Sequence, residues 1–162
     1  MKVSYKNLSK IKASTEKYKL INTKEELVFP QLQEGKQALF GEIDADVIFY
    51  GGGAGSGKSV GLLIDFARQE FISNPDYRAV IFRRTYPEFT QAGGLIDESQ
   101  KIYQAVKGNF IEKPPGWRFS FGSKISFRHL QYEKTVYVYQ GGQIARIGFD
   151  ELTHFTEEQF FY

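Results

Sequence analysis

The hydrophobic pattern of the chain changes period near residue 50. Residues 46–50 (DVIFY) form a short apolar, partly β-branched run that meets a glycine cluster, which is typical of a buried parallel strand. Beyond the glycines, apolar residues follow a helical spacing at Val60, Leu63, Ile64, Ala67 and Phe71. These positions share one face of a helix that we expect over residues 57 to about 73. The local order is therefore strand, glycine loop and helix.

A second strand and helix are predicted after this unit. The turn signal Asn74-Pro75-Asp76 precedes the apolar run 78–83, which predicts another buried strand, and residues 92–105 have a weak helical pattern. Upstream, residues 34–40 favour a short helix between Pro30 and Gly41. Because strands and helices alternate, the sequence predicts an α/β fold with a mainly parallel sheet.

The third quarter of the chain has the alternation of a β-hairpin. Apolar residues at 117, 119 and 121, and again at 125 and 127, alternate with polar ones across the turn Gly122-Ser123. Residues 136–139 are a candidate for one more strand, and 144–149 for the last. Thr156 and Gln159 then have the spacing of a capping box, so a helix should begin there.

Composition limits the classes of function that are compatible with this fold. Basic residues number 21 against 19 acidic ones, so net charge alone does not indicate a polyanion-binding protein, and any DNA contact must be local. Without cysteine the chain has neither disulfides nor thiolate zinc sites, and no apolar run is long enough for a bilayer. Residues 1–27 are rich in lysine and are interpreted as a basic arm, either a solvated terminus or a segment that touches DNA phosphates.

The glycine cluster matches the Walker A motif (P-loop), G-x-x-x-x-G-K-[ST], without exception. Its residues are Gly52, Gly53, Ala54, Gly55, Ser56, Gly57, Lys58 and Ser59. Glycines let the backbone curl so that amide N–H groups converge on phosphate oxygens, and the following helix start adds partial positive charge. Lys58 can reach the β- and γ-phosphates of ATP, in binding and in catalysis, and Ser59 can coordinate Mg²⁺. The flanking strand and helix disfavour the alternative of a glycine-rich turn with an incidental lysine.

Two adjacent acids end the last predicted strand, as in a Walker B motif. Residues 144–149 are mostly apolar, although Arg146 interrupts them, and they lead into Asp150 and Glu151. Neighbouring side chains on a strand point to opposite faces, so the acids should diverge unless the chain turns there. We assign Asp150 to Mg²⁺ and Glu151 to orienting or deprotonating the attacking water. His154, in the loop that follows, is a structural residue or a γ-phosphate sensor.

Together these motifs resemble the large subunit of tailed-phage terminases, the ATPases that drive DNA into procapsids. The resemblance covers about residues 28–162 and includes two more specific stretches, RRTYP at 83–87 and DELTHF at 150–155. It implies a P-loop fold of the additional-strand type, in which another strand separates the Walker A and Walker B strands, here with the hairpin inserted. It also implies that the family's later parts, including its nuclease domain, are missing, so we expect a truncated or split terminase without nuclease activity.

The resemblance further implies an adenine contact and a set of partners. Gln37, or less favourably Gln31 or Gln33, is expected to contact adenine through its amide. Many relatives carry a basic residue where this chain has Ala54, so another cation should face the transferring phosphoryl group; four arginines are candidates or ordinary surface residues, at positions 83, 84, 128 and 146. The implied partners are double-stranded viral DNA, the portal protein and the small terminase subunit, with a homo-oligomeric ring acting at the procapsid in the host cytoplasm and no membrane contact.

Two other functions share these motifs. A helicase-like ATPase stimulated by nucleic acid would use the same acids and the same phosphate loop. A nucleotide-binding module without turnover would keep the loop and lose the chemistry. We expect the 162-residue chain to be weakly active or inactive by itself.

Overall fold

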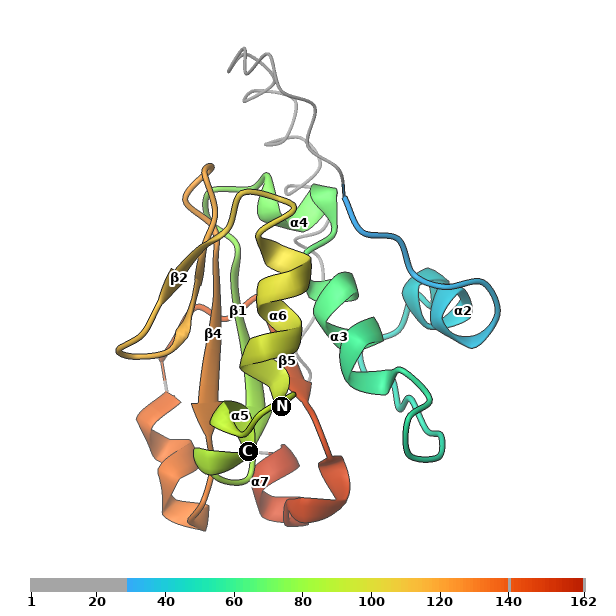
Figure 1. Ribbon diagram of the computed structural model, residues 1–162. Helices are drawn as coiled ribbons and strands as arrows, with labels where there is room; N and C mark the ends of the chain where they lie inside the picture. Colours follow the sequence, from blue (N-terminus) through green and yellow to red (C-terminus); the bar gives the residue numbers. More distant parts are fainter. Residues whose placement is uncertain (1–28, 140, 162) are drawn as a thin grey trace.

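A five-stranded sheet forms the centre of the computed structural model, which describes residues 29–139 and 141–161 (Figure 1). The arm expected over residues 1–27 lies outside the described residues. The strands are β1 (Arg78–Arg83), β2 (Asn109–Ile111), β3 (Gly116–Arg118), β4 (Lys124–His129) and β5 (Arg146–Phe149), in the order β2-β3-β4-β1-β5. β1 is parallel to β4 and β5, whereas β3 is antiparallel to β2 and β4. Only β3 therefore runs against the others, which confirms the predicted α/β fold with a mostly parallel sheet.

β1 is the central strand of the parallel part and is buried on both faces. Ala79 and Ile81 belong to one hydrophobic cluster, and Val80 and Phe82 belong to another. Side chains alternate between faces along a strand, so a continuous apolar run is what a two-sided core requires. The predicted strand 78–83 is confirmed with the same bounds.

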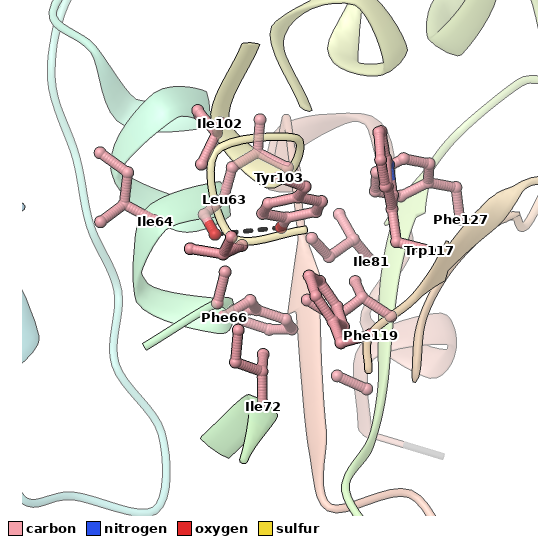
Figure 2. Close-up of a cluster of buried hydrophobic side chains, with 14 of the residues drawn as sticks. Leu63, Ile64, Phe66, Ile72, Ile81, Ile102, Tyr103, Trp117, Phe119 and Phe127 are labelled. Carbon is pink, nitrogen blue, oxygen red and sulfur yellow. Dashed lines mark hydrogen bonds between the residues drawn. The ribbon is translucent and has the colours of Figure 1, made fainter. Parts of the chain in front are cut away.

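Helices α3 (Lys58–Phe66) and α6 (Leu95–Tyr103) cover the face of the sheet that carries the larger hydrophobic cluster. Figure 2 shows their side chains meeting those of the strands around Tyr103 and Trp117. The Tyr103 hydroxyl donates to the carbonyl of Leu63 at 3.0 Å, and the Trp117 indole N–H donates to the Ser99 hydroxyl at 2.9 Å. Both buried polar groups are thereby satisfied, so the aromatic rings can occupy the core without an unpaired donor.

Short elements cover the opposite face and the ends of the sheet. They are the 3₁₀ helices η1 (Glu133–Tyr139) and η2 (Leu152–His154) and the helix α7 (Glu157–Phe161). Thr156 and Gln159 exchange side-chain to backbone hydrogen bonds at 3.2 and 3.3 Å, which confirms the predicted capping box. α2 (Lys36–Glu42) contacts α3, while α4 (Gln69–Ile72) and α5 (Pro87–Thr90) are single turns. None of the helices in the described ranges has the length and apolar character needed to cross a membrane.

The strand predicted over residues 46–50 is absent from the described part of the sheet. Val47 and Phe49 are instead 54% and 67% exposed. A strand needs a hydrogen-bonded neighbour, and within the described residues β5 is the edge strand on that side of β1. The prediction of a buried strand was therefore wrong, because an apolar run alone does not supply its partner.

Two further predictions are corrected. The single helix over 57–73 is split, because Arg68 is extended (φ −59°, ψ 146°) and its guanidinium binds Asp65 before the break and Glu70 after it. Residues 136–139, which were predicted to be a strand, are instead part of the 3₁₀ helix η1. A 3₁₀ helix has three residues per turn, so Val136 and Tyr139 lie on one side, where both pack in the cluster that contains Phe82.

Candidate functional site

The predicted site residues meet at the carboxyl ends of β1 and β5, beside the start of α3. β1 ends at Arg83 and β5 at Phe149, with Asp150 directly after it. The two strands are held in register there, since the Asp150 N–H donates to the Phe82 carbonyl at 2.9 Å. In parallel sheets this edge is where loops carry ligand-binding groups, so the sheet topology itself assembles the site.

The glycine loop turns sharply before α3. Gly55 and Gly57 have φ angles of 72° and 76°, in the left-handed region that glycine adopts without a steric penalty. A side chain at Gly57 is disfavoured both by this φ angle and by space, because an added Cβ would lie 2.7 Å from the Gln37 amide nitrogen. The first N–H groups of α3 have no partner within the helix, so the loop presents backbone donors at a helix start.

The Lys58 ammonium lies across this loop. Its Nζ donates to the carbonyl oxygens of Gly52 and Gly53, both at 2.8 Å. The lysine is thus held at the loop by hydrogen bonds that an incoming anion could replace. A phosphate oxygen is a stronger acceptor for an ammonium group than a neutral carbonyl.

Ser59 and Asp150 are in direct contact although they are 91 positions apart in the sequence. The Ser59 hydroxyl donates to Asp150 Oδ1 at 2.9 Å, and Asp150 is only 5% exposed. Both offer oxygen atoms, which are the ligands that Mg²⁺ prefers alongside water and substrate phosphates. The donor set therefore fits a magnesium ion that arrives with phosphates. The described residues contain no group of three or more carboxylates or histidines that could hold an ion by themselves.

Arg83 completes the surroundings of Asp150. Its Nε and Nη2 donate to Asp150 Oδ2 at 2.8 and 2.6 Å, and its Nη1 donates to the Glu88 carbonyl at 2.8 Å. Sequence reasoning named Arg83 only as one of four candidate arginines. The signal that could have identified it is its place at the end of a buried strand, because that edge of the sheet also receives Asp150.

Glu151 has a different environment from its neighbour. It is exposed and takes the left-handed conformation (φ 59°, ψ 54°), so the chain turns at this residue. A residue with a side chain rarely adopts this region, and such outliers often occur at functional sites. The two acids therefore present one buried and one exposed carboxylate.

Gln37 is buried and ties α2 to the glycine loop. Its Nε2 donates to the Gly57 carbonyl and its Oε1 accepts from the Gln33 N–H, both at 3.0 Å. The adenine contact of Gln37 stays a prediction, and it would require the amide to exchange one of these bonds. A hollow of about 200 Å³ lies beside it, lined by Gln33, Glu34, Lys36, Gln37, Tyr50, Gly51, Gly52, Gly53 and Ser56.

The other candidate arginines bind elsewhere. Arg84 donates to the Leu130 carbonyl and to Gln159, and Arg128 donates to the carbonyls of Pro115 and Phe127. Arg146 pairs with Asp65 at the far end of β5. His154 is exposed in η2. Of the four arginines, Arg83 is thus the one bound to the predicted magnesium ligand.

Fold and site together define a mixed α/β protein with a polar centre at the carboxyl edge of a mostly parallel sheet. A family model described as "Terminase large subunit, T4likevirus-type, N-terminal" matches residues 49–162, which is more than half of the chain. The chain belongs to this terminase large subunit family, and membership implies a part in viral DNA packaging. Searches of curated proteins and of solved structures gave no match.

Proposed function

We propose that the chain is the ATP-binding and ATP-hydrolysing part of a motor that packages double-stranded viral DNA into procapsids. The observation that carries the proposal is the contact between Ser59, which follows Lys58 at the start of α3, and Asp150 at the end of β5. A hydroxyl beside a phosphate-binding loop and a carboxylate on a neighbouring strand are the two protein groups that P-loop ATPases direct at Mg²⁺. Family membership favours packaging over a helicase-like role.

Nucleotide binding would use the loop and the start of α3. The backbone N–H groups of residues 52–59 would surround the phosphates, and the Lys58 ammonium would leave the carbonyls of Gly52 and Gly53 for the β- and γ-phosphate oxygens. The base would then occupy the adjacent hollow, which has Gln33 and Lys36 on its wall. Gln37 would support this arrangement through its bond to Gly57.

Hydrolysis would divide the work between the two acids. Mg²⁺, when bound, would neutralise charge that develops on the phosphate oxygens. Asp150 would hold the ion together with Ser59, while Glu151 would orient and polarise the water that attacks the γ-phosphorus and accept its proton. The difference in burial supports this division, because Asp150 is buried against Ser59 and Arg83 whereas Glu151 is exposed.

The same proposal places the chain in a larger assembly. We expect a P-loop fold of the additional-strand type, with β3 and β4 as its inserted hairpin, and a ring of identical subunits around the DNA. The portal protein and the small terminase subunit would be its packaging partners, at the procapsid in the host cytoplasm. An additional strand beside β5 would also explain why residues 46–50 find no partner among the described strands.

Calorimetric titration with Mg·ATP tests the binding step. Lys58→Ala should weaken binding by roughly tenfold or more, because a charge-assisted contact to the phosphates is lost while the backbone cradle remains. Lys101→Ala is the matched control, since Lys101 is exposed on α6 and pairs with Glu98. Equal affinity of the wild type and Lys58→Ala would refute the phosphate-loop assignment. Binding without steady-state turnover in the assembled motor would identify a nucleotide-binding module instead.

A further inference from the structure

We propose that Arg83 is a positioning residue that serves as the counter-ion of Asp150 until magnesium arrives with a nucleotide. This inference rests on the proposed assignment of Asp150 to Mg²⁺. Both oxygens of the carboxylate are engaged: Oδ1 accepts from Ser59 at 2.9 Å, and Oδ2 accepts from Nε and Nη2 of Arg83 at 2.8 and 2.6 Å. The two charged side chains are 12% and 5% exposed, so solvent screens this ion pair weakly.

Sheet register fixes the position of Arg83. Phe82 lies opposite Phe149 in the parallel pairing of β1 and β5, and the Asp150 N–H continues that ladder to the Phe82 carbonyl. The next residue of β1, Arg83, therefore comes beside Asp150. Its remaining donor, Nη1, binds the Glu88 carbonyl at 2.8 Å, which holds the planar guanidinium from its other side.

The Arg83 guanidinium, held in this way, determines the conditions under which a metal ion can bind to Asp150. Asp150 and Ser59 supply only two oxygen ligands, and Mg²⁺ requires about six. The guanidinium already neutralises the carboxylate, so a free ion gains little by displacing it. An ion that brings nucleotide phosphates gains further ligands at the same time. Arg83 would thus make metal binding at Asp150 depend on nucleotide.

The test measures metal binding without nucleotide. Arg83→Met removes the charge and leaves the buried Asp150 carboxylate without its partner, so the melting temperature should fall by roughly 5 °C or more. Millimolar MgCl₂ should then raise it by roughly 3 °C, because the ion takes the vacated role. The wild type should show no such magnesium response. Arg83→Lys, which keeps the positive charge, should also lack it.

The double variant Arg83→Met, Asp150→Asn assigns the response to this pair. It should lose the magnesium effect, because no carboxylate remains to attract the ion. Binding of Mn²⁺ by electron paramagnetic resonance provides a second readout at low temperature, and it should detect binding to Arg83→Met at least tenfold tighter than to the wild type. Arg83→Gln, which can still donate to the Glu88 carbonyl, replaces Arg83→Met in both measurements if the methionine variant does not fold.

Three results would overturn the inference. The first is metal binding by the wild type, without nucleotide, as tight as that of the Arg83 variant, the second is a magnesium response that persists in the double variant, and the third is the absence of any response in Arg83→Met. Failure of the proposed nucleotide site would look different, because the wild type would then not bind Mg·ATP. A wild type that binds Mg·ATP, together with an Arg83→Met variant that ignores free magnesium, would refute the role of Arg83 alone.

Discussion

Two buried aspartate–arginine pairs join α3 to the sheet at the two ends of β5, and they serve different purposes. Asp65, near the end of α3, binds Arg146 at the start of β5 at 2.6 Å. Asp150, after the end of β5, binds Arg83 at 2.6 Å and accepts a hydrogen bond from Ser59 at the start of α3. α3 and β5 therefore run in opposite senses, and each pair lies where one end of the helix meets one end of the strand.

The surroundings of the pairs decide what each can do. Asp65 is fully buried, and the Arg146 guanidinium lies over the rings of Phe71 and Phe66 at 4.5 and 5.5 Å. Burial raises the pKa of Asp65, while the charges of Arg146 and Arg68 oppose that rise. Asp150 instead adjoins the glycine loop and the exposed Glu151. The Asp65 carboxylate is fully enclosed by protein, and Asp150, beside the glycine loop, can exchange its partners with a ligand.

The largest expected effect is a loss of stability when the Asp65–Arg146 pair is broken. Arg146→Met keeps an apolar stem over Phe71 but leaves the Asp65 carboxylate with only Arg68, at 3.3 Å. Removing one partner of a buried pair costs about 3–5 kcal/mol, and the remaining arginine places the expectation near 3 kcal/mol of unfolding free energy, measured by urea titration. Mg·ATP affinity, measured where the variant is folded, should stay near the wild-type value because the change is at the opposite end of β5.

A double variant that removes both charges is the control for this result. Asp65→Leu combined with Arg146→Met replaces the ion pair by apolar groups, which is often neutral for stability. The double variant should therefore recover most of the loss. If it is as unstable as the sum of the single variants, packing and not the buried charge determines the contribution of Arg146.

Sequence reasoning found the parts of the fold that depend on local pattern. The run 78–83 carries its own signature, and so do the glycine loop and the capping box of Thr156 and Gln159. Residues 46–50 and 136–139 have equally apolar runs, yet neither is a strand among the described residues. Pairing partners decide these cases, and a partner far away in the chain leaves no local signal.

The site was predictable residue by residue but not as an arrangement. Asp150 and Ser59 were expected near one metal ion, and the structure brings them into contact. Arg146 looked like an imperfection in an apolar strand, because its partner Asp65 lies 81 positions earlier. The pairing of Arg83 with Asp150 depends on β1 lying next to β5, which only the strand order establishes.

The second effect separates the two adjacent acids. Asp150→Asn should weaken both Mg²⁺-dependent nucleotide binding and hydrolysis, because the charge that complements the metal is gone. Glu151→Gln keeps the side-chain shape, so ATP affinity should stay within a few-fold while turnover falls by roughly 10² or more. Affinity is measured by calorimetry on the chain, and turnover and DNA translocation in an assembled packaging motor that contains it.

The rate of ATP hydrolysis decides whether Asp150 and Glu151 have different roles. A Glu151→Gln motor should not translocate DNA, since it cannot complete a cycle. Near-normal turnover in that variant would place the catalytic carboxylate elsewhere and would show that the Walker B register is wrong. Loss of binding in Glu151→Gln equal to that in Asp150→Asn would show that the two acids share one role.

The smallest effect concerns the backbone at Glu151, which is left-handed at φ 59° where Asp150 is not. A residue with a Cβ is disfavoured there by about 1 kcal/mol relative to glycine. Glu151→Gly should therefore be more stable than Glu151→Ala by about 1 kcal/mol, a difference of roughly 2–4 °C in melting temperature. Both variants lack the carboxylate, so both should lose turnover, and their comparison isolates the backbone term from the loss of the side chain. If Glu151→Gly is the less stable of the two, the turn after β5 is not strained. The conformation of Glu151 would then be no evidence that the protein gives up stability to hold this carboxylate in place for chemistry.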